Sequence, residues 1–295
     1  MNNRALFEAA TGYSVTHSEL ACLCREYAAF FAANEKQLLF LVASNRINML
    51  AAYQGAIEAG HAVLLCDAAI PRDQFEKLCS AYRPSCVVAP REWAIPCASL
   101  SHVMHGVNIS YLSSKETPAL HPELSLLLST SGSTGSSKMV RLSRRALEAN
   151  SDQIVLACGI KATDRAAAHM PWHYSYGFSV IQSHLAAQAS LVLFDDGLTS
   201  GSFWDAARKY GVTTLPGTPY HFSILERLGL TDGLLPSLRI ITQAGGALDV
   251  RLAGDLACYM KKRHGHFYAM YGQTEAGPRM TVLPSDMAIR KAGSV

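Results

Sequence analysis

The chain has 295 residues, of which 49% are hydrophobic and 17% are charged, and its formal net charge at pH 7 is +3. This much apolar material can bury a sizeable core, so the composition excludes an intrinsically disordered protein. The basic residues are scattered along the chain, which excludes the extended positive surface of a nucleic-acid-binding protein.

The cysteines and the apolar stretches give expectations about cofactors and location. The eight cysteines form neither a CxxC pair nor a Cys/His cluster with zinc spacing, so we expect reduced thiols. The N-terminus lacks a signal-peptide core, and no apolar stretch is long enough to span a bilayer. We therefore expect a soluble, cytoplasmic protein without a membrane span.

Short apolar runs alternate with amphipathic stretches along most of the chain. Each run resembles a strand that is covered on both faces. They lie at residues 37–43, 62–66, 86–89, 124–129, 190–194 and 238–242.

Two of the intervening segments carry clear helix signals. Thr16 and Glu19 have the spacing of a capping box, in which a hydroxyl and a carboxylate satisfy free backbone N–H groups at a helix start. A second helix is predicted to begin after Pro71 and to run over residues 72–82.

This alternation predicts βαβ units and an α/β fold with two lobes, each built on a mostly parallel sheet. We place the first lobe at residues 1–165 and the second at residues 166–295. The segment 113–122, rich in Pro, Ser and His, is the predicted loop ahead of the central motif.

The segment 126–138 joins a predicted strand to a loop of small and hydroxylated residues that ends at a lysine. Glycines allow close backbone approach, hydroxyls donate hydrogen bonds and a lysine adds positive charge, so the loop suits polyphosphate. Its spacing excludes a Walker A loop, and composition alone favours a flexible Ser/Gly turn. The candidate phosphate ligands are Thr130, Ser131, Gly132, Ser133, Thr134, Gly135 and Lys138.

Two later segments follow predicted strands. Residues 243–248 place a glycine pair after one strand, and residues 271–277 place a hydroxyl and a carboxylate after another. The carboxyl ends of strands are where open α/β sheets bind ligands. Taken singly, each segment is also typical of an ordinary turn at a strand end.

Together, in this order and spacing, the three segments resemble the motifs of the adenylate-forming (AMP-binding) superfamily, which includes acyl-CoA and aryl-CoA synthetases, peptide synthetase adenylation domains and luciferases. The loop at 130–140 is similar to the family pattern TSGSTGxPKGV. Ser137 and Met139 depart from the usual proline and glycine, and Arg144 stands where histidine is common. The resemblance extends over nearly the whole chain and implies the N-terminal domain of such an enzyme, without its small C-terminal lid domain.

The resemblance implies ATP and Mg²⁺ as cofactors. Tyr271 would pack on adenine, Thr274 would bind the α-phosphate and Glu275 would hold Mg²⁺. The remaining implied ATP-binding residues are Gly245, Gly246, Ala247, Gly272 and Gln273, beside the loop residues named above.

The segment 171–177 is similar to the P-x-x-H-x-x-G stretch of CoA ligases, in which the histidine faces the bound carboxylate. This nominates His173 as catalytic, with Lys138, Thr274 and Glu275. The implied acid pocket is lined by His173, Tyr176, Gly217, Tyr220 and Gly245. No acidic residue occurs from 169 to 194, so the chain lacks the usual partner of a substrate ammonium group, which favours an acid without an α-amino group.

The implied reaction joins a small carboxylic acid to ATP, giving an acyl-adenylate and pyrophosphate, followed by transfer to CoA or to the phosphopantetheine of an acyl carrier protein. Because the family's lid lysine would lie beyond residue 295, we expect the chain as given to be impaired or inactive. Two alternatives stay open: a non-catalytic nucleotide-binding or interaction protein on this scaffold, and an amino-acid adenylation domain.

Overall fold

The computed structural model describes residues 4–33, 35–93, 98–112, 119–130, 139–229 and 235–294. The chain divides into two compact units, each built on its own sheet. Unit 1 comprises Met1–Ser14, Glu148–Met170 and Ser175–Val295, and unit 2 comprises Val15–Leu147 and Pro171–Tyr174. The expected α/β fold is confirmed, and the predicted boundary at residue 165 stays a prediction.

A seven-stranded sheet, with the order β6-β7-β5-β3-β4-β8-β9, forms the centre of unit 2. The strands β3, β4, β5 and β8 pair in parallel, whereas β6, β7 and β9 add antiparallel edges. The strands are β3 (Leu38–Ala43), β4 (Ala62–Asp67), β5 (Cys86–Pro90), β6 (Ala98–Met104), β7 (Val107–Leu112), β8 (Leu124–Ser129) and β9 (Met139–Ser143).

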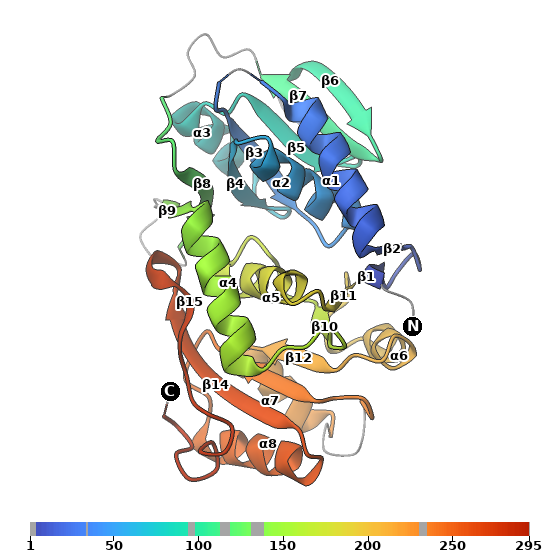
Figure 1. The fold of residues 1–295 in the computed structure, drawn as a ribbon, viewed down its shortest axis with the longest axis vertical. Coiled ribbons are helices and arrows are strands. Elements are labelled where there is room, and N and C mark those ends of the chain that lie inside the picture. Colours follow the sequence, from blue (N-terminus) through green and yellow to red (C-terminus); the bar gives the residue numbers. More distant parts are fainter. Residues whose placement is uncertain are drawn as a thin grey trace. The chain divides into compact units, whose positions relative to one another are not determined.

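Helices cover both faces of this sheet (Figure 1). Phe75 of α3 (Arg72–Tyr82) packs against Phe40 on one face, and α2 (Ile47–Glu58) packs on the other face. The helix α1 (His17–Phe31) begins at the predicted capping box, where the Glu19 backbone N–H donates to the Thr16 hydroxyl. The predicted bounds of α3 are confirmed.

The helices α1 and α2 touch through Gly55. A Cβ atom added at Gly55 would lie 2.5 Å from Cβ of Tyr27 and 2.7 Å from the carbonyl oxygen of Cys24. Both neighbours belong to α1, and the second is backbone, so neither can move aside cheaply. The glycine therefore sets the distance between the two helices.

The second sheet has eight strands, in the order β15-β14-β13-β12-β10-β11-β1-β2. The pairings that run from β1 through β11, β10, β12 and β13 to β14 are parallel, and β15 adds an antiparallel edge. The strands are β1 (Arg4–Glu8), β2 (Ser14–Thr16), β10 (Arg165–Ala168), β11 (Ser190–Leu193), β12 (Thr214–Gly217), β13 (Ile240–Gln243), β14 (His266–Gln273) and β15 (Gly277–Val282).

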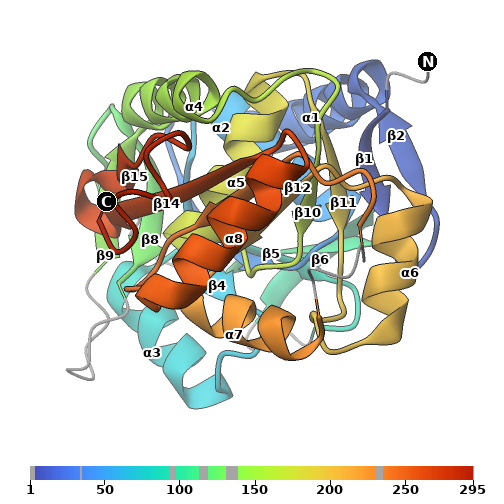
Figure 2. The same cartoon turned by 90° about the horizontal axis from the view of Figure 1, so that it is seen from below.

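Alternating side chains of β13 and β14 face two helical layers. Ile241 and Phe267 pack with α6 (Gly201–Lys209), α7 (Pro219–Arg227) and α8 (Val250–Lys262), and Figure 2 shows α8 running beside β14. Ile240 and Tyr268 face α4 (Arg144–Cys158) instead. The helix α5 (Ser175–Ala186) contacts β10, β11 and β15.

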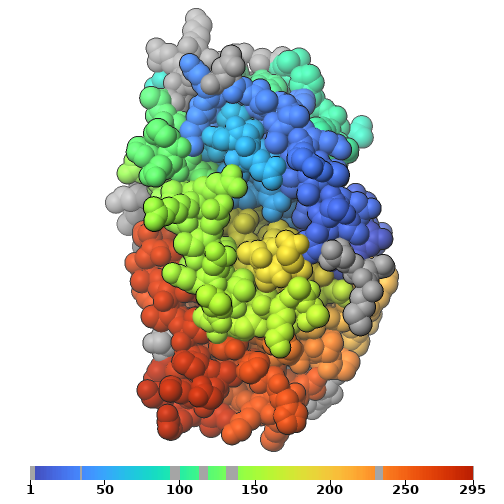
Figure 3. Space-filling view, in the orientation of Figure 1, coloured from blue at the N-terminus to red at the C-terminus, as the bar shows by residue number. Residues whose placement is uncertain are grey.

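The outer face of α4 is turned to solvent. Figure 3 shows its yellow-green surface toward the viewer, and Leu156 on this face is 81% exposed. Ile154 and Cys158 point the other way and are buried against the sheet. Among the described residues, no helix is long and apolar enough to cross a membrane.

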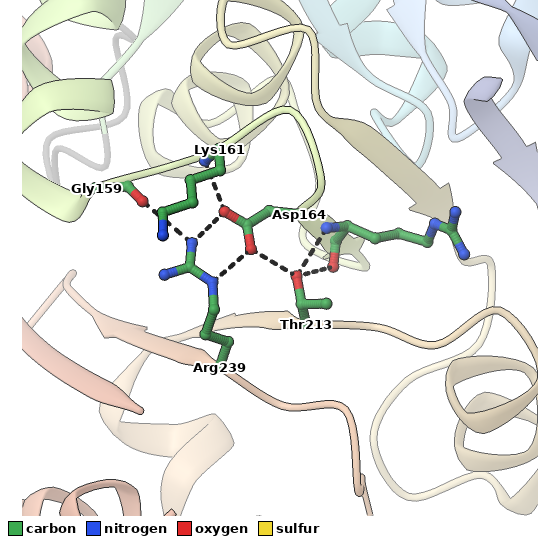
Figure 4. A network of polar contacts seen from close by, with 6 residues as sticks. Gly159, Lys161, Asp164, Thr213 and Arg239 are labelled. Carbon is green, nitrogen blue, oxygen red and sulfur yellow. Dashed lines mark hydrogen bonds and ion pairs between the residues drawn. The ribbon is translucent and has the colours of Figure 1, made fainter. Parts of the chain in front are cut away.

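A buried ion pair joins three segments at the amino-terminal edge of the parallel strands (Figure 4). Asp164, which precedes β10 and is 2% exposed, accepts hydrogen bonds from the Arg239 guanidinium, including one from Nε at 2.7 Å. It also accepts from the Lys161 backbone N–H at 2.7 Å and from the Thr213 hydroxyl at 3.2 Å. Burial alone raises the pKa of Asp164, but these donors and the Arg239 charge outweigh it and hold the pKa below its ordinary value.

Replacing Gly55 by alanine should destabilise unit 2 by about 2 kcal/mol, because overpacking at a closed helix contact exceeds the gain in helix propensity. Gly254 in α8 is the matched control, since an added Cβ there meets nothing within 4 Å. Gly254→Ala should raise the free energy of unfolding by roughly 0.5–1 kcal/mol. Urea denaturation of both variants measures the two signs, and equal effects would contradict the proposed contact.

Asp164→Asn should lower the free energy of unfolding by about 3 kcal/mol at pH 7, because it leaves Arg239 partly buried without its carboxylate. The stabilisation from a lowered carboxyl pKa is present above the unfolded value of about 3.9 and is lost as pH falls through the folded value. The difference between wild type and variant should therefore shrink below about pH 4. Asp152→Asn, on the exposed side of α4, is the control in the same urea titrations and should change little.

Candidate functional site

Three loops of unit 1 leave neighbouring parallel strands at one edge of the sheet. Gly217 at the end of β12 pairs with Gln243 at the end of β13, and Gln243 pairs with Ala269 of β14. Because the strands are parallel, their carboxyl ends meet at the same edge, and the loops that follow lie side by side. The predicted glycine, hydroxyl and carboxylate segments of unit 1 all belong to these loops.

The loop after β13 lies flat against the start of α7. Gly245 and Gly246 have φ values of 83° and 154°, which L side chains rarely adopt. A Cβ at Gly245 would lie 3.4 Å from Cγ2 of Thr218, and one at Gly246 would lie 3.3 Å from Cγ of Pro219. The Gln243 side-chain amide donates to the Gly246 carbonyl at 2.8 Å, which holds the turn. Residues 245–247 remain exposed, so their backbone is open to a ligand.

The loop after β14 forms the turn into β15. Tyr271 is 51% exposed, and Thr274 and Glu275 sit on the short 3₁₀ helix Thr274–Ala276. The Thr274 hydroxyl donates to Oγ of Ser175 at 3.2 Å, which ties the turn to the first residue of α5. Glu275 is exposed. A Cβ at Gly272 would lie 2.2 Å from the backbone nitrogen of Arg279, so only glycine fits there.

Tyr176 connects the first turn of α5 to the end of β13. Its hydroxyl donates to the Thr242 carbonyl at 2.8 Å and lies 3.0 Å from the Thr242 hydroxyl. Burial raises the pKa of Tyr176 to about 12, so the phenol is neutral at pH 7. Tyr220 on α7, also predicted to line the acid pocket, is 71% exposed.

His173 belongs to unit 2, where the segment Pro171–Tyr174 packs at the carboxyl edge of the parallel strands. The buried Trp172 donates from Nε1 to the Ser44 carbonyl, which follows β3, at 3.0 Å. Nε2 of His173 lies 3.7 Å from Oδ2 of Asp67, the last residue of β4. Thr130 follows β8, the next strand of the same sheet, and is half-buried.

The protonation of His173 depends on two opposing effects. Burial lowers its pKa below the ordinary value, and the Asp67 carboxylate partly offsets that by raising it. The net direction is downward, so the imidazole is neutral at pH 7 and can accept a hydrogen bond.

The rest of the predicted phosphate loop, from Ser131 to Gly135 together with Lys138, lies outside the described residues. Within the described part of the chain, no group of three or more His, Cys, Asp or Glu side chains could hold a metal ion. Glu275 offers a single exposed carboxylate. That arrangement fits Mg²⁺, which proteins often bind through one or two carboxylates while phosphate oxygens and water complete the shell.

Sequence reasoning missed three polar side chains at these edges: Ser175, Asp67 and Arg279. Ser175 lies inside the segment 171–177, and Asp67 directly follows the apolar run at 62–66. Arg279 lies four residues after Glu275 and belongs to no motif. Arg279 is only 6% exposed in the folded hairpin, and no pattern in the sequence predicts this burial.

The family model for AMP-binding enzymes matches residues 1–295. The chain therefore belongs to the family of AMP-binding enzymes. Malformin synthetase mlfA of Aspergillus luchuensis is 25% identical over 246 residues, which cover 80% of this chain and 5% of that protein. Acyl-CoA synthetase ALT10 of Alternaria alternata is 29% identical over 154 residues, which cover 52% of this chain and 26% of that protein. The chain thus spans only a small part of these relatives.

Solved structures share the fold. The N-terminal domain of FACL13 from Mycobacterium tuberculosis superposes with a TM-score of 0.78 at 16% identity, covering 99% of this chain and 77% of that chain. VinN, solved with L-aspartate, gives 0.79 at 20% identity and covers 99% and 77%. The nonribosomal peptide synthetase FmoA3, solved with AMPPNP, gives 0.78 at 19% identity and covers 97% and 31%. The expected fold, the N-terminal domain of adenylate-forming enzymes, is confirmed.

The His173 imidazole should titrate below its ordinary pKa of about 6.5, and Asp67→Asn should lower that pKa further, since the variant removes the carboxylate whose charge opposes the effect of burial. NMR observation of the histidine ring protons as a function of pH measures both values. An unchanged or raised His173 pKa in the variant would contradict the pairing with Asp67.

Proposed function

We propose that this protein activates a small carboxylic acid with ATP, forming an acyl-adenylate and releasing pyrophosphate. The observation that carries the proposal is the gathering of the loops after β12, β13 and β14 at one edge of unit 1, in a chain whose whole length matches the AMP-binding family. These loops offer groups that are suited to binding a nucleotide: an exposed glycine backbone, an exposed tyrosine ring, and a hydroxyl beside a carboxylate.

In the proposed reaction a carboxylate oxygen of the acid forms a bond to the α-phosphorus of ATP. The bond between that phosphorus and the bridging oxygen breaks, and pyrophosphate leaves with the electron pair. Thr274 binds the α-phosphate, and its hydroxyl is held by Ser175 in the free protein. Lys138 and the loop hydroxyls stabilise the negative charge of the phosphates. Glu275 holds Mg²⁺, which supplies further charge neutralisation when it is bound.

For the acid, we propose a site in unit 1 that is lined by Tyr176, Gly217, Tyr220 and Gly245. The family resemblance gives His173, in unit 2, the role of the histidine that faces the reacting carboxylate. A neutral imidazole suits this role, because it neither repels the incoming carboxylate nor neutralises it by proton transfer. The backbone of Gly217 has no room for a larger residue, since an added Cβ would lie 2.9 Å from the Phe222 ring. Tyr176 is fixed at both ends, by its helix and by Thr242.

The proposed second step transfers the acyl group to a thiol, either of CoA or of the phosphopantetheine on a carrier protein. The similarity to an acyl-CoA synthetase supports the first acceptor, and the similarity to a peptide synthetase supports the second. ATP and CoA are reactants of the cytoplasm, so the proposal places the protein there.

Glu275→Gln should reduce acid-dependent exchange of labelled pyrophosphate into ATP by about 100-fold, because Mg²⁺ loses its protein carboxylate while the side chain keeps its size. Asp286→Asn is the matched control, since Asp286 is an exposed carboxylate of the same unit and lies outside the three loops. The measurement uses the full-length protein and a panel of aliphatic and aromatic acids.

Each outcome of this experiment separates the candidate functions. Exchange that is lost in Glu275→Gln and kept in Asp286→Asn supports the proposal. Equal exchange in both variants and wild type would refute the role of Glu275. Saturable ATP binding without exchange for any acid would favour a non-catalytic nucleotide-binding protein instead.

A further inference from the structure

Arg279 is a buried cation without an anion. It lies in β15 with 6% of its surface exposed, and among the described residues no carboxylate lies within ion-pair distance of it. Arg239 of the same unit, by contrast, is paired with the buried Asp164. Burying an unpaired charge is expensive, so an arginine kept in this state calls for an explanation.

The guanidinium is held in place on two sides. Nε donates to the Ser179 hydroxyl of α5 at 3.1 Å, and Cζ lies 5.2 Å from the centre of the Tyr176 ring. The Arg279 backbone packs closely against Gly272, where an added Cβ would lie 2.2 Å from the Arg279 backbone nitrogen. Nη2 is buried, and among the residues that the structure describes it has no hydrogen-bond partner. The fork is therefore oriented, and one of its donors is free.

Among the described residues, the titratable groups that interact with Arg279 supply no negative charge. Burial raises the pKa of the Cys158 thiol, although Arg279 opposes that shift, and burial likewise raises the pKa of Tyr176 to about 12. His184 is buried, and burial lowers its pKa to about 4, so it too is neutral at pH 7. Ser179 does not titrate in this range. The cation is thus surrounded by neutral donors and acceptors.

This cation lies against Tyr176, one of the residues proposed to hold the acid. Tyr176 separates Arg279 from the end of β13, where its hydroxyl meets Thr242, two residues before Ala244 and the exposed glycine pair. Thr274 and Glu275 precede Arg279 in the same hairpin. A substrate that reacts near Thr274 could reach Arg279 with its far end.

We propose that Arg279 binds a second carboxylate on the substrate, so that the acid activated at this site is a dicarboxylic acid. The inference rests on the proposed function, because it identifies the acid pocket with the surroundings of Tyr176. A guanidinium with one free donor and an oriented plane recognises a carboxylate by charge and by geometry. The bound carboxylate supplies the missing anion, and the hydrogen bond to Ser179 orients the guanidinium toward it.

The test compares substrates and variants in one set of measurements on the full-length protein. Succinate, glutarate, adipate and suberate are titrated calorimetrically with MgATP present, beside butyrate, valerate, hexanoate and octanoate, and pyrophosphate exchange is recorded for each acid. Arg279→Met removes the charge and keeps the length of the side chain, and Arg279→Lys keeps the charge without the planar fork. Arg290→Met, at an exposed arginine of the same unit, is the matched control.

We expect wild type and Arg290→Met to prefer one of the dicarboxylates over its matched monocarboxylate by about 100-fold or more, since a site built for a polar group rejects the analogue that lacks it. Arg279→Met should lose that preference by weakening dicarboxylate binding while monocarboxylate binding holds or improves. Arg279→Lys should fall between them. Thermal unfolding should show no loss of stability in Arg279→Met, because an apolar side chain replaces an unpaired buried charge.

Two results would overturn the inference. One is exchange that wild type supports best with monocarboxylates, which would leave the proposed adenylation standing and refute the second carboxylate. The other is a variant Arg279→Met that loses stability and all acids alike, which would make Arg279 a structural residue held by buried water. Dicarboxylate binding that depends on Arg279 without any pyrophosphate exchange would sustain the inference and refute the proposed reaction.

Discussion

The parallel register of β12, β13 and β14 is the constraint on which the candidate site of unit 1 depends. Because Gly217 pairs with Gln243 and the neighbouring strand follows in step, three loops from distant parts of the sequence end at one edge. A shift of one residue would turn Ile241 from the helical layer of α8 to that of α4 and would displace the glycine pair. The packing of both faces therefore fixes the position of the loops.

The opposite edge of the same strands carries the ion pair of Asp164 and Arg239. There the carboxylate joins the turn before β10 to the starts of β12 and β13, through Thr213 and Arg239. A buried pair of this kind specifies which segments meet more than it adds net stability, because desolvation offsets much of the attraction. One edge of the sheet is thus fixed by charge pairing, and at the other edge the backbone of residues 245–247 is exposed.

The sequence predicted much of this fold because its signals are local. Buried apolar runs predicted the positions of β3, β4, β5 and β8. The capping box at Thr16 and the bounds of the helix after Pro71 were confirmed to the residue. The antiparallel hairpin of β6 and β7 was missed, since its strands lack a continuous apolar run. The motifs indicated which loops matter, whereas the His173–Asp67 approach and the burial of Arg279 arise from tertiary packing between segments that no sequence spacing relates.

Arg239 and Arg279 show how the same side chain serves different ends within one unit. Arg239 enters the interior beside a carboxylate that the chain itself supplies, so its charge is compensated whenever the protein is folded. Arg279 enters beside a hydroxyl, a phenol ring and a neutral thiol, and no carboxylate of the described residues compensates its charge. A protein can retain the free-energy cost of an unpaired buried charge at a binding site, because ligand binding removes that cost. The bound anion then forms a strong charge-assisted hydrogen bond to the guanidinium away from water. Under the proposal, the buried Arg279 is therefore oriented for its ligand before the ligand binds, so part of the specificity for the acid is already present in the free protein.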